Sequence, residues 1–438
     1  MRYTIFAVMK TFTKILISIF FIFLIATLTM VVPATANTIS ITSSNDSLSS
    51  ESTVYDTIAN DTLITEEDLA WPYNIISRID NLLDNNIFST STVGMMIYDL
   101  TADSVIYRHN EKQLMRPAST MKMIVSVAAL DNIGYEHEYR TILAIKGDTI
   151  DRVLIGDMYC KGDFDPAFND EDLESFVNSV KNLGIDTIRG DIVADLSMKD
   201  DLLLGEGWCW DDDNPILSPL LLSRKNNFME CFTKRLNDEG IIIEGKIRID
   251  DMPRSAKIID VKTRTVADLL PHMMKVSDNL YAETLFYHLA SSIGTSRPAT
   301  AKAGRQMVNR LISKVGHKPS HYYIADGSGL SLYNYVSPEL ETDILKYAFH
   351  KEHIYPYLFN SMPIAGKDGT LSKRMQRGYA YGNVHAKTGT VTGVSALAGY
   401  CTAANGHILC FSIINMGIRN ASTGRRFQDK ICQALCRP

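Results

Sequence analysis

Residues 116–130 read RPASTMKMIVSVAAL, and this segment carries the clearest chemical signal in the chain. The apolar run from Met121 predicts a buried helix, and Pro117 stands just ahead of it, where proline favours a helix start. In such a helix Ser119 and Lys122 lie one turn apart on the same face. A serine hydroxyl becomes a good nucleophile when a neighbouring base takes its proton, and a buried lysine of lowered pKa can be that base.

An isolated Ser-x-x-Lys pattern has a simpler interpretation, which is an N-cap serine followed by a surface lysine. The long apolar helix buries the surroundings of Ser119 and Lys122 and favours the catalytic interpretation. The helix N-terminus also presents free N–H groups and positive potential, which would stabilise an oxyanion that forms there.

A second motif, Ser277-Asp278-Asn279, lies within residues 261–289, where the apolar pattern predicts two packed helices. The motif falls between these helices, and three small polar residues make a natural turn and N-cap. Helix capping alone would explain this segment, so its catalytic interpretation depends on the other motifs.

A third motif, Lys387-Thr388-Gly389, begins the segment 386–395 with the sequence AKTGTVTGVS. This composition, rich in β-branched and small residues, predicts a strand. The glycine would let a substrate approach the backbone of that strand closely. The simpler interpretation is an ordinary edge strand with an exposed lysine.

In this order, the three motifs resemble those of penicillin-binding proteins and serine β-lactamases. The chain is similar to the low-molecular-mass class C penicillin-binding proteins, a serine family of D-alanyl-D-alanine carboxypeptidases and endopeptidases. Other segments also resemble loops of that family, and the likeness covers most of the chain from about residue 93 onward. These segments are residues 156–166, 205–212, 326–331 and 362–371.

The resemblance implies acyl transfer through a covalent intermediate on peptidoglycan stem peptides, with inhibition by penicillins. Ser119 would attack the carbonyl between the two D-alanines, and Lys122 would take its proton. Ser277 would pass a proton to the departing amine. Asn279 would hold the substrate amide and orient Lys122.

The third motif would bind the other end of the substrate. By the same resemblance, Lys387 and Thr388 would bind the terminal carboxylate of the peptide, or the corresponding carboxylate of a penicillin. Gly389 and Thr390 would also line the substrate site, and the backbone N–H groups of Ser119 and Thr390 would form the oxyanion hole.

Two other functions remain open for this fold. A serine β-lactamase needs fast deacylation and carries a Glu-x-x-x-Asn loop soon after its Ser-x-Asn motif, and no convincing equivalent lies between Asn279 and Lys387. A penicillin-binding sensor with little turnover is the second alternative. The balance between carboxypeptidase and endopeptidase activity also stays open.

The resemblance predicts an α+β fold, in which an antiparallel sheet with helices forms the catalytic domain and a smaller α/β domain is inserted. The catalytic domain is expected from residues 68–145 and 259–438, and the insert from residues 146–258. Relatives usually carry a further domain inside that insert. Here Ser218–Arg224 runs almost directly into a helix, so this innermost domain is expected to be missing.

The N-terminus predicts export from a bacterial cytoplasm to the periplasm or cell envelope. Ile15–Val32 is a continuous apolar run that follows basic residues, and Ala34-Thr35-Ala36 supplies a cleavage pattern. We therefore expect a signal peptide at residues 1–36, with an uncleaved membrane anchor as the alternative. Residues 37–67 are dense in Ser, Thr, Asn and Asp, which predicts a disordered linker.

Composition argues against other function classes. Lys and Arg number 44 against 50 Asp and Glu, a net charge of −6, and no basic stripe suggests nucleic acid. We see no phosphate-binding loop, and no cofactor and no metal site are expected. The expected partners are peptidoglycan stem peptides and β-lactams.

The seven cysteines raise the question of disulfides in an exported chain. If Asn405-Gly406 forms a two-residue hairpin turn, Ala404 pairs with His407 and Cys401 lies directly opposite Cys410. Such a non-hydrogen-bonded pair has Cα atoms about 4.5 Å apart, which is within disulfide range. Two reduced cysteines packed as small apolar residues are the equally weighted alternative.

Overall fold

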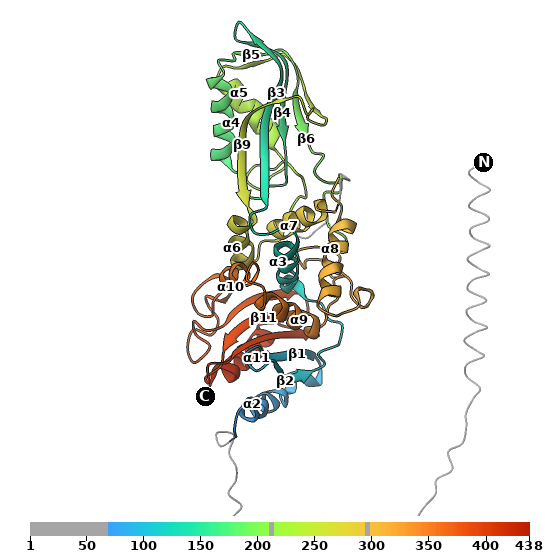
Figure 1. The fold of residues 1–438 in the computed structure, drawn as a ribbon, viewed down its shortest axis with the longest axis vertical. Helices are drawn as coiled ribbons and strands as arrows, with labels where there is room; N and C mark the ends of the chain where they lie inside the picture. Colours follow the sequence, from blue (N-terminus) through green and yellow to red (C-terminus); the bar gives the residue numbers. More distant parts are fainter. Residues whose placement is uncertain (1–68, 210–213, 294–297) are drawn as a thin grey trace, which may run out of the picture. The chain divides into compact units, whose positions relative to one another are not determined.

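The computed structural model describes residues 69–209, 214–293 and 298–438, all within one compact unit (Figure 1). The expected signal peptide and linker, residues 1–67, lie outside the described residues. In the part of the chain that is described, no helix has both the length and the apolar character needed to cross a membrane.

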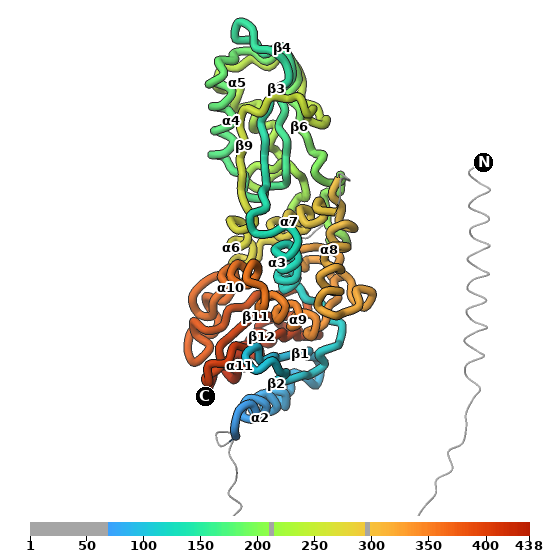
Figure 2. The backbone as a smooth tube through the Cα atoms, in the orientation of Figure 1, coloured from blue at the N-terminus to red at the C-terminus, as the bar shows by residue number. Residues whose placement is uncertain are grey.

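A five-stranded antiparallel sheet joins the two ends of the chain, and its strand order is β10-β11-β12-β1-β2. Figure 2 shows the early strands, in blue, beside the late strands, in red. The predicted α+β fold is confirmed. The strands are β1 (Thr92–Asp99), β2 (Ser104–His109), β10 (His385–Val391), β11 (Val394–Thr402) and β12 (Ile408–Met416).

Helices cover both faces of this sheet because its strands carry apolar side chains on both faces. In β1, Met95 and Ile97 belong to one apolar core, whereas Met96 and Tyr98 belong to the other. The first face packs against α2 (Tyr73–Leu83) and α11 (Ala421–Cys436). The second face packs against α9 (Pro338–Phe349), with α3 (Met121–Asn132) next to it.

Further helices surround α3, which is buried along almost its whole length. Within the described residues, each of these helices presents apolar residues to the same core. They are α6 (Val266–Val276), α7 (Asn279–Ser291), α8 (Ala301–Lys314) and α10 (Tyr355–Ser361). The two predicted helices around residues 261–289 are therefore confirmed as α6 and α7.

A second sheet of seven strands is inserted between α3 and α6. Its long strands β3, β4 and β9 pair antiparallel, whereas the short strands β5 to β8 pair parallel. With two helices it encloses its own apolar core. The elements are β3 (Glu138–Ile150), β4 (Val153–Lys161), α4 (Asp170–Asn182), β5 (Thr187–Ile188), β6 (Ile192–Asp195), α5 (Phe228–Asp238), β7 (Ile242–Ile243), β8 (Ile247–Ile249) and β9 (Lys257–Thr265).

The predicted register of the β11–β12 hairpin is wrong by one residue. Cys401 pairs with Leu409, and Tyr400 is the residue opposite Cys410. The reason is the loop: the Ala403 N–H bonds to the His407 carbonyl, which leaves a three-residue loop instead of a two-residue turn. Because side chains alternate along a strand, Cys401 and Cys410 lie in the two different cores.

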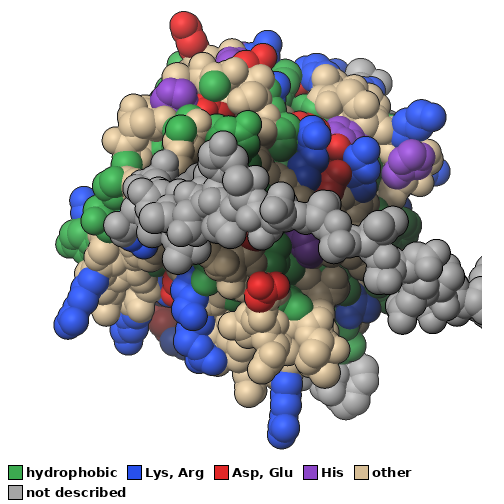
Figure 3. Space-filling model, turned by 90° about the horizontal axis from the view of Figure 1, so that it is seen from below, with side chains coloured by type: hydrophobic (Ala, Val, Ile, Leu, Met, Phe, Trp, Pro, Cys, Tyr) green, Lys and Arg blue, Asp and Glu red, His purple; other side chains and the backbone are tan. Residues whose placement is uncertain are grey.

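The surface mixes charges of both signs. On the face seen in Figure 3, Lys and Arg side chains and fewer Asp and Glu side chains are scattered among uncharged residues. The whole chain is weakly acidic, with 44 basic against 50 acidic residues.

Candidate active site

Ser119 lies in a short 3-10 turn, Ala118–Thr120, which leads directly into α3. The turn is tightly constrained, because Ala118 has a positive φ of 49°. At Gly329 a Cβ atom would lie 1.8 Å from the Ala118 carbonyl oxygen, so only glycine permits this approach. The predicted helix start is confirmed, with the serine half-buried at its first turn.

The buried carboxyl group of Glu341 connects the turn Ala118–Thr120 to strand β12 of the sheet. It accepts hydrogen bonds from the hydroxyls of Thr120 and Ser412, the latter at 2.6 Å. Burial raises the pKa of Glu341 to about 7. Because Thr120 directly follows Ser119, this contact fixes the position of the serine relative to β12.

Lys122 is fully buried, and its Nζ contacts three oxygen atoms. These are Ser119 Oγ at 3.0 Å, Asn279 Oδ1 at 2.8 Å and the Ser328 carbonyl at 2.7 Å. Burial lowers the pKa of Lys122 to about 8, because its charged form has lost the surrounding water. A lysine in this position can give up its proton near neutral pH and accept one from Ser119.

The motif 277–279 occupies the junction of α6 and α7. Ser277 ends α6 in a left-handed conformation, with φ 64°, and Asp278 caps α7 by accepting from the N–H of Leu280 at 3.0 Å. The capping interpretation is therefore confirmed. The same geometry leaves Ser277 and Asn279 free to contact the two buried lysines of the site.

Lys387 is the second of these buried lysines. Its Nζ donates to Ser277 Oγ at 2.8 Å and to the Thr388 carbonyl at 2.8 Å. Burial lowers the pKa of Lys387 well below its usual value, and the positive charge of Lys122 lowers it further. Lys387 on β10 thus contacts Ser277, whereas Lys122, beside Ser119, contacts Asn279. The second motif therefore connects the first motif with the third.

Strand β10 is an edge of the sheet, and its free side faces the site. The Ala386 N–H bonds to the Pro363 carbonyl on that free side, at 3.0 Å. Because backbone groups alternate along an antiparallel strand, the N–H groups of Thr388 and Thr390 point to the same side. Thr388 also hydrogen-bonds through its hydroxyl to Thr370, at 2.8 Å.

Gly389 lets the edge strand β10 lie close to the backbone at Ser119. A Cβ atom at this position would lie 2.6 Å from the Pro117 carbonyl oxygen and 3.1 Å from the Ser119 nitrogen. The sequence suggested close approach by a substrate. The structure shows that the protein's own backbone, next to Ser119, makes this approach.

The loop 326–331 supplies a contact that sequence reasoning missed. Glu283 is fully buried on α7 and accepts from the N–H groups of Gly327 and Ser328, at 3.1 and 2.7 Å. This holds the Ser328 carbonyl against Lys122. Burial raises the pKa of Glu283 to about 8. Its sequence signal was a charged residue inside an otherwise apolar helical run.

Comparisons with known proteins identify relatives of this chain. The model of the D-Ala-D-Ala carboxypeptidase 3 (S13) family matches residues 75–220 and 222–437. A D-alanyl-D-alanine carboxypeptidase of an Actinomadura species is 25% identical, over 77% of this chain and 80% of the relative. The D-alanyl-D-alanine carboxypeptidase DacB of Haemophilus influenzae is 26% identical, over 73% and 84%.

The fold also matches a solved structure. The crystal structure of penicillin binding protein 4 from Haemophilus influenzae superposes with a TM-score of 0.74 at 24% identity. The match covers 82% of this chain and 98% of that protein. The likeness therefore includes the inserted sheet as well as the five-stranded sheet with its helices.

Proposed function

The chain belongs to the D-Ala-D-Ala carboxypeptidase 3 (S13) family and is a serine-type peptidase of the penicillin-binding class; from this premise we propose how its own residues work. The substrate is a peptidoglycan stem peptide, and the reaction passes through an acyl-enzyme on Ser119. The observation that carries the proposal is the continuous set of contacts from Ser119 through Lys122 to Asn279, with Lys387 bonded to Ser277 beside it.

The first step is attack on the penultimate D-alanine. Ser119 Oγ attacks the carbonyl carbon while Lys122 Nζ, 3.0 Å away, takes the hydroxyl proton. The carbonyl oxygen becomes an oxyanion between the N–H groups of Ser119 and Thr390. The free edge of β10 makes the Thr390 donor available, and each such donor contributes about 3 kcal/mol in comparable enzymes.

The second step is departure of the leaving group. Ser277 lies 2.8 Å from Lys387 Nζ and can pass a proton to the amine as the carbon–nitrogen bond breaks. In a carboxypeptidase that amine belongs to the terminal D-alanine, and in an endopeptidase it belongs to a neighbouring cross-linked stem. Water then attacks the ester, and the acyl group leaves Ser119 as a carboxylate.

Binding of a carboxylate at the third motif would change the protonation of both lysines. Lys387 has no counter-charge among the two oxygen atoms that it contacts, and burial lowers its pKa. The carboxylate of an arriving substrate supplies that counter-charge and favours protonated Lys387. The protonated lysine in turn favours neutral Lys122, so substrate binding would prepare the base for its reaction.

Location follows from the substrate. A cell-wall peptide lies outside the cytoplasm, and the apolar N-terminal run followed by Ala34-Thr35-Ala36 supports export of the chain. We therefore propose action in the periplasm or cell envelope.

The test is product analysis with purified cross-linked muropeptides. We expect the mature protein to release D-alanine, to split cross-links, or to do both, and mass spectrometry of the products separates these activities. The Ser119→Ala variant is the control and should leave every muropeptide intact. Muropeptides that the wild-type protein leaves unchanged would contradict the proposed function.

A further inference from the structure

Two segments of the catalytic domain carry an excess of positive charge. Residues 366–382 and 417–438 together contain nine Lys and Arg residues, two Asp and no Glu, although acidic residues outnumber basic ones in the whole chain. The first segment is the loop before β10, and the second contains α11. A local excess of one sign favours partners of the opposite charge.

The two segments lie side by side. Arg374 of the loop donates to the Asp429 carboxylate of α11 at 2.8 Å. Further along the helix, Gln433 donates to the Arg377 carbonyl at 2.7 Å and accepts from the Ala380 N–H at 3.3 Å. The loop therefore follows α11, and their exposed side chains form one surface.

Both acidic residues of these segments have partners within the protein. Asp429 pairs with Arg374, which is buried, and Asp368 pairs with Lys275 of α6 at 2.7 Å. The exposed cations between them form no ion pair among the described residues. We call four of these cations the basic face, namely Lys373, Arg377, Arg426 and Lys430.

The basic face is unfavourable for the helix that carries half of it. Arg426 and Lys430 are one turn apart on the exposed side of α11, where like charges repel each other. The only side-chain hydrogen bond that Arg426 makes in the described part of the chain is to the hydroxyl of Thr423, at 3.3 Å. An anionic partner would remove this repulsion.

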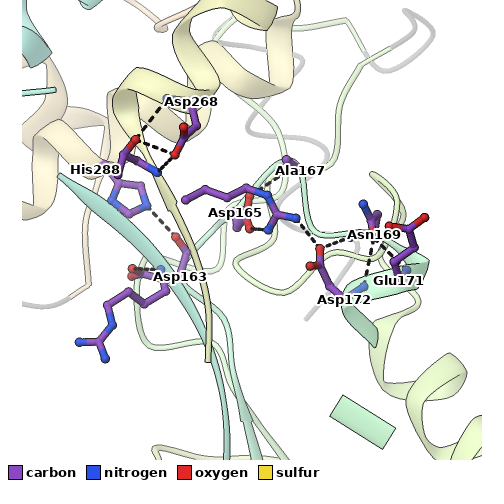
Figure 4. Close-up of polar contacts among 11 residues, drawn as sticks. Asp163, Asp165, Ala167, Asn169, Glu171, Asp172, Asp268 and His288 are labelled. Atoms are coloured by element: carbon purple, nitrogen blue, oxygen red, sulfur yellow. Dashed lines mark hydrogen bonds and ion pairs between the residues drawn. The ribbon is translucent and has the colours of Figure 1, made fainter. Parts of the chain in front are cut away.

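The inserted domain treats its arginines differently. In Figure 4, Asp165 and Asp172 bind the guanidinium of Arg264, at 2.5 Å each. Arg248 of β8 likewise pairs with three carboxylates. These arginines are neutralised within the fold, whereas the cations of the basic face are left to a partner outside it.

Two exposed tyrosines belong to the same loop. Tyr379 and Tyr381 are 55% and 49% exposed, and Lys367 Nζ lies 6.0 Å from the ring centre of Tyr381. A tyrosine combines an apolar ring with a polar hydroxyl, which suits the headgroup level of a bilayer. Basic residues beside such rings are typical of a surface that lies on an anionic membrane. A soluble polyanion would require the charges alone.

The start of the described chain lies beside this surface. Helix α2 packs against α11, and Arg78 of α2 donates to the Arg437 carbonyl at 2.9 Å (Figure 1). Figure 3 views the molecule from the end that carries α2, and Lys and Arg side chains outnumber Asp and Glu there. The apolar run Ile15–Val32 precedes α2 in the sequence, so the same end of the fold follows the segment expected to meet a membrane.

We propose that the basic face, together with Tyr379 and Tyr381, binds the surface of a membrane that contains anionic phospholipids. The four cations would contact lipid phosphates, and the two rings would lie among the headgroups. Such binding is peripheral and is weakened by salt. It is independent of the chemistry at Ser119.

Vesicle sedimentation with the mature protein tests this proposal. The probes are vesicles of phosphatidylcholine alone and vesicles that also contain about 30% phosphatidylglycerol, where each cation near the anionic surface contributes about fivefold in affinity. We expect a partition coefficient about 10²-fold higher for the anionic vesicles at about 0.1 M NaCl, and loss of most of this difference at about 0.5 M NaCl.

The main variant replaces all four cations of the basic face with Gln. Its partition coefficient on anionic vesicles should fall to near the value for phosphatidylcholine alone. The matched control removes the same charge from four exposed lysines elsewhere and should bind like the wild type. These are Lys146 and Lys257 on the insert and Lys302 and Lys318 near the two ends of α8.

Penicillin acylation checks the folding of each variant, because the substituted residues lie outside the site around Ser119. If the fourfold variant is not acylated, Lys373 and Arg377 are replaced as one pair and Arg426 and Lys430 as another. Each pair should lower the partition coefficient by about tenfold or more.

A double variant, Tyr379→Ala with Tyr381→Ala, distinguishes a membrane from a soluble polyanion. It should bind anionic vesicles about tenfold less tightly than the wild type, while its binding to soluble polyphosphate stays the same. Equal binding of the wild type to both kinds of vesicle would overturn the proposal, as would equal losses in the basic-face and control variants. Unchanged vesicle binding by the tyrosine variant would show that the surface recognises polyanions in general, which would overturn the membrane assignment.

Discussion

Lys122 and Ser119 are in direct contact, with 3.0 Å between the lysine Nζ and the serine Oγ. The other two contacts of this Nζ are an amide oxygen and a backbone carbonyl, so none of its three partners is a carboxylate. The lysine is therefore held by neutral acceptors, which compensate its burial less well than a charged partner would. This relationship explains why its pKa lies near 8 and why it can serve as a base.

The first prediction concerns pH. In the proposed mechanism the neutral form of Lys122 is the base, so the acylation rate should rise as pH rises through about 8. Below that pH the neutral fraction falls about tenfold per unit, and the second-order rate constant should fall with it. Stopped-flow acylation by a fluorescent penicillin between pH 6 and 9 measures this. A rate that stays constant between pH 6 and 8 would contradict the assignment of Lys122.

The second prediction separates the two buried lysines. Lys122→Ala removes the base, so acylation should slow by about 10²- to 10⁴-fold even at saturating penicillin. Lys387→Ala removes carboxylate binding, so it should mainly raise the penicillin concentration needed for half-maximal rate. Thermal unfolding of both variants checks that they fold. Normal acylation by Lys122→Ala at saturation would show that this division of roles is wrong.

The third prediction concerns Gly389 and the fit of β10 against Ser119. A methyl group at this position would meet the Pro117 carbonyl at 2.6 Å, so Gly389→Ala should push the strand away from the nucleophile. We expect acylation to slow by about 10- to 100-fold, because small displacements of reacting groups have large effects. The control is Gly393→Ala: its φ is 76°, but nothing lies within 4 Å. It should lower the melting temperature while acylation stays near that of the wild type.

The fourth prediction follows from the corrected hairpin register. Cys401 faces the core beneath α11, and Cys410 faces the core beneath α9, so the two thiols are on opposite sides of the sheet. Peptide mapping without reduction, on protein from its native envelope, should find no bond between them. A cross-linked peptide that contains both residues would show that the register described here is not the one in solution.

The sequence was most informative where function depends on local chemistry. The spacing of Ser119 and Lys122 predicted their contact, and the polar residues 277–279 predicted a turn between two helices. The predicted register of the β11–β12 hairpin was wrong for a physical reason. Asn405-Gly406 indicates a turn but does not determine how many residues the loop contains. With one more residue in the loop, Cys401 and Cys410 lie on opposite faces of the sheet instead of the same face.

Residues that act through long-range contacts could not be predicted from the sequence. Glu283 differs from its neighbours only as a charged residue in an apolar helical run, and Glu341 gives no such signal. Only the fold places them against the Ser328 loop and the Ser119 turn. Pattern and spacing describe neighbours in sequence, whereas these roles depend on neighbours in space.

The central claim is that Ser119 is the residue that forms the acyl-enzyme, and intact-protein mass spectrometry after incubation with penicillin tests it most directly. The wild-type protein should gain the mass of one penicillin molecule, and the adduct should persist, since a β-lactamase would release it quickly. The Ser119→Ala variant should gain nothing. An adduct of equal yield on the Ser119→Ala protein would contradict the account.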